Sequence, residues 1–242
     1  MAAHFTDGLN IAQGFALQVE AQSIFSLLRD GHREIQSIRH ISVSADSVFV
    51  LTSIGVEKAM KAIMGLCHLR DVGEWPSTAT ILGWGSDMAA LNKRFEATLT
   101  RNVAGASHGE YLGRLLAAHR LDRYWPLLID VLDHYGRSGQ FYVLDHLAEA
   151  DPAWEAPVES WSRLEYAVLS DYPGLVASLI SPLEADAGRR ELGEYVARTL
   201  LDWWRLIHRF CIDGCFGERG TSVGQQLAPP DVMISEFEFD AR

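Results

Sequence analysis

The sequence predicts an all-α fold, a helical bundle of about seven to nine helices, and three observations support this prediction. Apolar residues recur every three to four positions along almost the whole chain, which is the period of an amphipathic helix. Few segments show the alternation of apolar and polar residues that is typical of a half-buried strand. With 242 residues, 48% of them hydrophobic, the chain can bury a sizeable core. We expect one helical domain over residues 1–224 and an extended C-terminal arm over residues 225–242.

The first two helices are expected at about residues 8–30 and 44–70. The first segment carries an apolar stripe at helical spacing, and Gly31 is expected to end it. The second is apolar around most of its circumference, which predicts a helix at the centre of the bundle. Gly55 and Gly65 inside it cost about 1 kcal/mol each relative to alanine. That cost predicts that another backbone packs closely at these two positions.

The next segment, residues 73–87, is expected to be a loop, because one proline and several glycines interrupt the helical pattern. A third helix should follow at about residues 87–100. Either Ser86 or Asp87 has the type of side chain that caps the first turn of such a helix.

The second half of the chain shows the same helical period in further segments, interrupted by prolines, glycines and polar residues. These helices are expected at about residues 109–121, 126–134, 140–150, 159–170, between Pro173 and Pro182, and over a last long stretch at 189–211.

The C-terminal end differs from the rest of the chain. Four glycines between residues 214 and 224 have no preceding strand and no Gly-Lys-Ser/Thr element, so a phosphate-binding loop is not favoured. They predict the end of the last helix and a flexible connector. In residues 232–239, the side chains at the even-numbered positions would lie on one face of an extended chain and those at the odd-numbered positions on the other. This pattern predicts a short strand or an extended arm.

The composition limits the partners and the compartment that we expect. The 21 basic and 32 acidic residues give a net charge of −11, which repels DNA and anionic membranes and leaves RNA binding to a local basic patch. No run of 18 apolar residues and no secretion signal is visible, so a cytoplasmic location is expected. The three cysteines, Cys67, Cys211 and Cys215, are too few for a disulfide framework, which fits a reducing compartment. No cofactor is predicted.

Two adjacent tryptophans predict self-association. Neighbouring residues on a helix point about 100° apart, so Trp203 and Trp204 cannot both face the main apolar stripe of the last helix. We expect Trp203 in the core and Trp204 either in a second packing layer or in an interface with a partner chain, where tryptophan is enriched, and we favour the interface. Together with the broad apolar faces and the terminal arm, this predicts a homodimer.

Three short segments resemble the HEPN superfamily of bacterial helical proteins, which includes abortive-infection and toxin members. They are RDGH at 29–32, GVEKAMKAIMGL at 55–66 and GWGSDMAALN at 83–92, with Ser86 at the place where a histidine is expected. The resemblance covers about 110 N-terminal residues and implies a homodimeric module that binds a partner in bacterial defence or stress. The alternative is a generic helical bundle in which Glu57 and Lys61 form an ion pair on a helix surface.

The same resemblance implies a metal-independent endoribonuclease as an alternative function. Many HEPN members cleave RNA with an arginine followed, after four to six residues, by a histidine. Arg114 and His119 match this spacing, and their place in the chain favours them over the other matches, although Leu115 stands where catalytic members usually have a small polar residue. In this role His119 would carry the proton and Arg114 would contact the scissile phosphate. The other matches are Arg33 with His40 and Arg101 with His108.

Two Asp-His pairs leave a further alternative open, a metal-dependent hydrolase. Asp133-His134 and Asp145-His146 could supply carboxylate and imidazole ligands if their helices face each other. Their spacing is more typical of a helix end, a turn and a new helix. The sequence therefore favours a binding module over a nuclease, and a nuclease over a metal enzyme.

Overall fold

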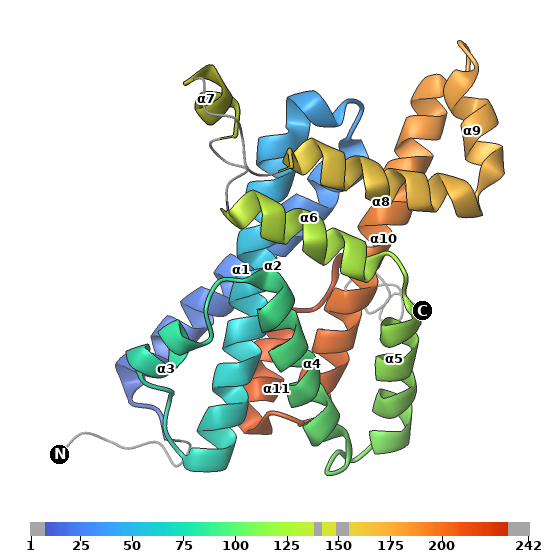
Figure 1. Ribbon diagram of the computed structural model, residues 1–242. Coiled ribbons are helices and arrows are strands. Elements are labelled where there is room, and N and C mark those ends of the chain that lie inside the picture. The colour runs from blue at the N-terminus through green and yellow to red at the C-terminus, as the bar shows by residue number, and fades with distance from the viewer. Residues whose placement is uncertain (1–7, 138–141, 149–154, 232–242) are drawn as a thin grey trace.

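The computed structural model describes residues 8–137, 142–148 and 155–231, and throughout these residues the fold is all-α, as predicted (Figure 1). The helices are α1 (Ile11–Ser37), α2 (Ile41–Val72), α3 (Thr78–Gly83), α4 (Met88–Val103), α5 (Gly109–Leu121), α6 (Trp125–Arg137), α7 (Tyr142–Leu147), α8 (Pro157–Asp171), α9 (Pro173–Ile180), α10 (Ala185–Ile212) and α11 (Gly217–Gln226).

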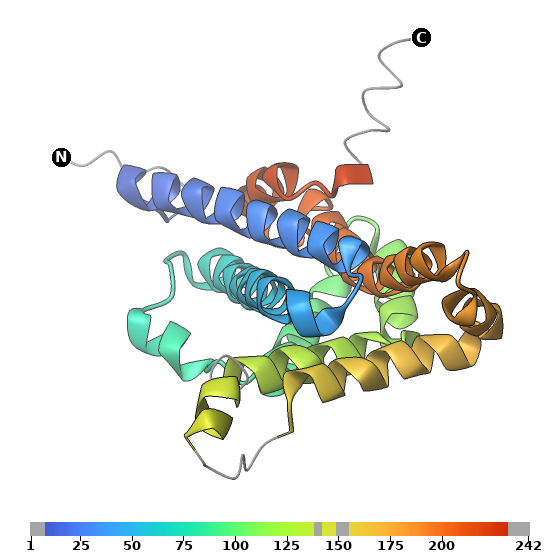
Figure 2. The same ribbon diagram turned by 90° about the horizontal axis from the view of Figure 1, so that it is seen from above.

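Two long helices organise the bundle. α2 packs against α1, α4 and α6, and α10 packs against α1, α5, α8, α9 and α11. Figure 2 shows α1 along α2, with α6 and α8 side by side on the other side of the molecule. The core between these layers is rich in aromatic residues, and the rings of Trp125 and Trp203 stack with their centroids 4.8 Å apart. The predicted central position of α2 is thus confirmed, because other helices cover several of its faces.

The prediction that Gly31 ends the first helix is wrong. α1 continues through Gly31 to Ser37, and Gly31 is buried at the point where α1 crosses α2. A Cβ atom at Gly31 would lie 2.7 Å from Oγ1 of Thr52, so the glycine permits the close approach of the two helices. Gly55 likewise faces the backbone of Leu28. Gly65 faces a side chain instead, the indole ring of Trp75.

Residues 73–87 contain a short helix, α3, where a loop was predicted. The Ser77 hydroxyl caps this helix by accepting a hydrogen bond from Thr80 N at 3.2 Å. At the end of the segment, Asp87 caps α4 and accepts from Ala90 N at 2.8 Å, so the predicted start of this helix is confirmed.

The predicted flexible connector after the last long helix is also wrong, because α11 forms there. A Cβ atom at Gly224 would lie 2.5 Å from Cβ of Cys211, so this glycine lets α11 pack closely on α10. Gly224 therefore serves helix packing, which its sequence position alone does not reveal. Gly214, in the turn that follows α10, and Gly217, at the start of α11, have positive φ, so the predicted end of the last long helix is confirmed.

Trp204 is buried inside the bundle, so its predicted position in a partner interface is wrong. Its ring packs edge-on against Phe25 of α1, with centroids 5.7 Å apart, and its Nε1 donates to the carbonyl oxygen of Leu227 at 2.7 Å. Trp203 lies in the core, as predicted. The alternating residues 232–239 lie outside the described residues.

None of the helices in the described ranges combines the length and apolar character that are needed to cross a bilayer.

Candidate functional site

Arg114 lies on the solvent side of α5. Its side chain is 68% exposed, and Nη1 donates to Oε1 of Glu110 at 2.8 Å, one helical turn earlier. An exposed pair at this spacing stabilises a helix only slightly. Arg114 therefore has the surroundings of a surface residue.

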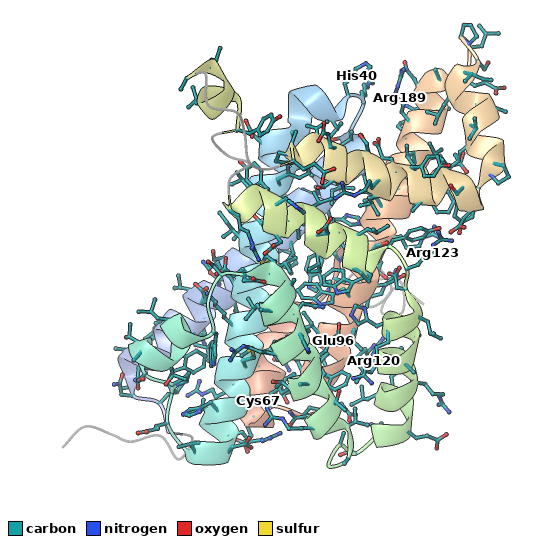
Figure 3. The ribbon with its side chains drawn as sticks, in the orientation of Figure 1. His40, Cys67, Glu96, Arg120, Arg123 and Arg189 are labelled. Atoms are coloured by element: carbon teal, nitrogen blue, oxygen red, sulfur yellow. The ribbon has the colours of Figure 1, made fainter. Side chains whose placement is uncertain are left out.

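His119 faces another direction, because five residues on a helix correspond to a rotation of about 140°. Its ring packs edge-on against Trp125, with centroids 5.4 Å apart, and its Nε2 is buried without a hydrogen-bond partner in the part of the chain that the structure describes. Burial lowers the pKa of His119, while Glu96 on α4 raises it and Arg120 lowers it. Glu96 and Arg120 form a loose ion pair at 3.9 Å (Figure 3).

His119 lines a cleft of about 410 Å³ between α5 and α10, but Arg114 is not among the residues that line this cleft. Arg114 and His119, the two residues of the predicted nuclease site, thus lie in different surroundings. The lining residues are Tyr111, Leu115, Ala118, His119, Asp122, Asp202, Arg205, Leu206, His208, Arg209 and Asp231.

Several charged groups of this cleft already have partners within the fold. Arg205 pairs with Asp202, and its Nε and Nη2 donate to Oδ2 of Asp231 at 3.0 and 2.6 Å. Asp122 accepts hydrogen bonds from the backbone N–H groups of Tyr124 and Trp125, at 2.8 and 3.3 Å, where α6 begins. Burial raises the pKa of Asp122. These groups stabilise the local structure, and a ligand would have to compete with their partners.

The other two Arg-His pairs also have separate surroundings. Arg101 donates to Oγ1 of Thr98 at 3.4 Å, whereas His108 pairs with Asp213 after the end of α10. In the remaining pair, Arg33 lies on α1 and His40 occupies the N-cap position of α2.

Asp133 has a structural role. Its Oδ1 accepts from Met88 N at 2.8 Å, at the start of α4, and its Oδ2 lies 2.8 Å from Nε of Arg137. His134 Nδ1 lies 2.8 Å from the carbonyl oxygen of Asp130. The side chains of Asp145 and His146 lie outside the described residues. Over residues 8–137, 142–148 and 155–231, no three His, Cys, Asp or Glu residues are grouped as metal ligands.

The three cysteines are buried free thiols. Burial raises the pKa of Cys67 to about 12 and that of Cys215 to about 11, and it raises the pKa of Cys211 further. All three thiols are therefore protonated at neutral pH and are poor nucleophiles.

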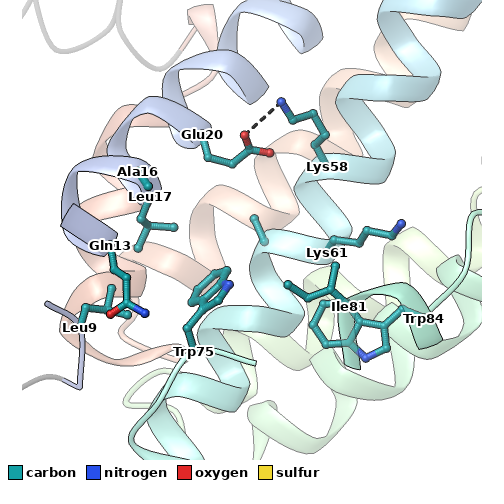
Figure 4. A pocket seen from close by; sticks show the side chains of 11 residues that line it. Leu9, Gln13, Ala16, Leu17, Glu20, Lys58, Lys61, Trp75, Ile81 and Trp84 are labelled. Carbon is teal, nitrogen blue, oxygen red and sulfur yellow. Dashed lines mark ion pairs between the residues drawn. The ribbon is translucent and has the colours of Figure 1, made fainter. Parts of the chain in front are cut away.

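A second cavity, of about 380 Å³, lies where α1, α2 and the segment 73–87 meet, and the sequence did not predict it (Figure 4). Its walls are mostly apolar, with a few charged groups. The lining residues are Leu9, Gln13, Ala16, Leu17, Glu20, Lys58, Lys61, Ala62, Trp75, Ile81 and Trp84.

Gly65 explains how one wall of this cavity forms. A Cβ atom there would lie 2.6 Å from Cη2 of Trp75, so only glycine leaves room for the indole ring against α2. Ile81 of α3 and Trp84 after it contribute the neighbouring wall. Trp75 precedes α3 in the sequence and Trp84 follows it, so this short helix places both tryptophans at the cavity.

The charged groups of the cavity belong to two ion pairs on α1 and α2. Lys58 Nζ lies 3.0 Å from Oε2 of Glu20, and it donates to Oγ of Ser23 at 3.0 Å. Lys61 Nζ donates to Oε1 of Glu57 at 2.6 Å, which confirms the ion pair predicted from their spacing. Both lysines are partly buried rather than fully exposed, with side-chain exposures of 31% and 23%.

Comparisons with known proteins identify no similar family or relative. No family model matches the chain, and no curated protein or solved structure matches it either. The HEPN resemblance therefore stays a prediction from sequence, and the candidate sites rest on their geometry.

Proposed function

We propose that this protein is a binding module for a small molecule with an apolar body, which it holds in the cavity between α1, α2 and the segment 73–87. The observation that carries the proposal is the lining of the cavity. Apolar walls with two tryptophans and a few charged groups are the usual composition of a small-molecule site. The volume, about 380 Å³, also lies in the usual range of such sites.

A flat aromatic body suits these walls best. Trp75 and Trp84 offer ring faces and edges, and aromatic pairs gain about 0.5–1.5 kcal/mol beyond the burial of their area. Burying about 150 Å² of apolar ligand surface contributes about 4 kcal/mol at roughly 25 cal/mol per Å². After the costs of association, we expect dissociation constants of roughly 10 μM to 1 mM for a simple two-ring compound.

Calorimetric titration with 2-naphthoate tests the proposal. The matched variants are Ile81→Ala and Leu82→Ala, because both residues belong to α3 but only Ile81 lines the cavity. Leu82 is 73% exposed. We expect Ile81→Ala to weaken binding about fivefold, as the loss of about 1 kcal/mol of contact implies, and Leu82→Ala to leave it unchanged. No binding of either 2-naphthoate or the neutral 2-naphthylmethanol at millimolar concentration, or equal weakening by both substitutions, would refute the proposal.

The nuclease alternative receives less support from the geometry. Arg114 is paired with Glu110 at the surface, and the buried Nε2 of His119 does not readily accept a charge. RNA cleavage by these two residues stays a prediction from sequence. The same is true of the homodimer and of a role in bacterial defence.

A further inference from the structure

We propose that the ligand of this cavity carries an anionic group, a carboxylate or a similar oxyanion, and that the ammonium group of Lys61 binds it. This inference rests on the proposed function, because it assigns the chemical class of the ligand at the same site.

Lys61 has more unused hydrogen-bond donors than Lys58 has. An ammonium group has three N–H donors. Lys58 directs its donors to Glu20 and Ser23, both at 3.0 Å, whereas Lys61 donates to Glu57 alone among the described residues. Two donors of Lys61 are thus free for a ligand or for water.

The position of Lys61 suits a ligand whose body lies between the tryptophans. Figure 4 shows its side chain on the same side of the cavity as Ile81 and Trp84. The Lys61 side chain is 23% exposed, so its charge is partly desolvated and interacts more strongly with an anion than a surface lysine does. A ligand that stacks on Trp84 can place an acidic group within reach of this ammonium.

The charged groups that line the cavity favour contact with an anion. Lys58 and Lys61 line it together with one carboxylate, Glu20. Glu57, which pairs with Lys61, does not line the cavity, and with it the four charges sum to zero, whereas the whole chain carries −11. The cavity therefore lacks the negative charge of the whole chain, and a ligand there contacts more ammonium than carboxylate groups.

Three probes with the same naphthalene body test the inference by calorimetry at neutral pH and low ionic strength. They are 2-naphthoate, 2-naphthylmethanol and 2-naphthylmethylamine, which are anionic, neutral and cationic. We expect the anion to bind about tenfold more tightly than the alcohol, since about 1.4 kcal/mol is a usual gain for a partly desolvated charged hydrogen bond. The amine should bind most weakly.

Two substitutions separate direct binding from a structural role of the ion pair. Lys61→Gln should weaken binding of 2-naphthoate about tenfold and so remove its preference over the alcohol. Glu57→Gln breaks the same ion pair but leaves the ammonium in place, so it should maintain or increase the affinity for 2-naphthoate.

The outcomes also separate the two proposals. If none of the probes binds, the proposed function fails. If all three bind equally, or if Glu57→Gln weakens anion binding as much as Lys61→Gln does, the cavity binds apolar molecules but the anion inference is wrong.

Discussion

Two cavities of this protein, the cleft between α5 and α10 and the tryptophan-lined cavity, are similar in volume, about 410 and 380 Å³, but they differ in what their polar groups already do. In the cleft between α5 and α10, Arg205 is paired with two carboxylates and Asp122 accepts from two backbone N–H groups. In the tryptophan-lined cavity, the walls are mostly apolar, and Lys61 donates to Glu57 alone among the residues that the structure describes, which leaves it two further donors. An abundance of titratable residues is therefore a poor guide to a binding site when the fold uses those residues for its own stability.

The largest effect that we expect concerns Asp133, one of the residues that the sequence suggested as a metal ligand. Asp133→Ala should lower the free energy of unfolding by about 1–2 kcal/mol, because Met88 N–H and Arg137 both lose a partner at the start of α4. Urea denaturation measures the change. Glu110→Ala, which removes an exposed carboxylate, is the control and should have no measurable effect. Equal stability of both variants would contradict the structural role of Asp133.

A pair of glycine substitutions sharpens the comparison at the tryptophan-lined cavity. Gly65→Ala should weaken binding of 2-naphthoate by about fivefold or more, because the added Cβ displaces the ring of Trp75 from its place against α2. Gly136→Ala is matched to it, since this helical glycine has no neighbouring heavy atom within 4 Å of the added Cβ. The affinity of the Gly136→Ala variant should equal that of the wild type. A wild-type affinity in both variants would show that Trp75 is not part of the site.

The pH dependence of stability tests the description of His119. The pKa of His119 is lowered in the folded protein. As the pH falls below about 6.5, the ordinary pKa of a histidine, the unfolded chain therefore binds a proton at this residue more readily than the folded protein does. The free energy of unfolding should therefore fall as the pH decreases from 7.5 to 5.5, and burial of His32 acts in the same direction. His119→Phe should reduce this fall. Burial raises the pKa of Asp122 and Glu165, which acts in the opposite direction, so the difference in slope between wild type and His119→Phe isolates the histidine. An unchanged slope in His119→Phe would contradict the account.

The smallest expected effect is on RNA. We expect wild-type protein, Arg114→Ala and His119→Ala to behave alike when incubated with transfer RNA at low ionic strength in the presence of a chelator. The reason is the exposed position of Arg114, outside the cleft that His119 lines. Gel electrophoresis of the RNA measures the result. If the wild type cleaves the RNA and both substitutions abolish the cleavage, the nuclease function is favoured over the binding module.

Local sequence signals predicted the helices well. The bounds predicted for α5, residues 109–121, are those of Gly109–Leu121, and Asp87 caps α4 as its side-chain chemistry indicates. Two errors, at Gly31 and at the connector after α10, arose where a glycine acts through a distant contact. The local sequence predicts that Gly31 ends a helix, but in the structure Gly31 lies against Thr52 of the next helix.

The candidate site could be predicted only in part, for the same reason. The predicted pair of Glu57 and Lys61 depends on spacing within one helix, and it is present. The cavity beside it depends on how α1, α2 and the segment 73–87 meet. Its signal in the sequence was weak: Trp75 and Trp84, two tryptophans that flank a short apolar stretch in a segment rich in glycine.

The most direct test of the account is the ¹H–¹⁵N correlation spectrum of the tryptophan indole and arginine Nε groups during titration with 2-naphthoate. The chain has seven tryptophans, and the variants Trp75→Phe, Trp84→Phe and Arg205→Lys assign the signals that matter. The account predicts saturable shifts of the Trp75 and Trp84 indole signals, with the Arg205 Nε signal unmoved. Shifts of the Arg205 signal while Trp75 and Trp84 stay unchanged would place the ligand in the cleft between α5 and α10 and contradict the account.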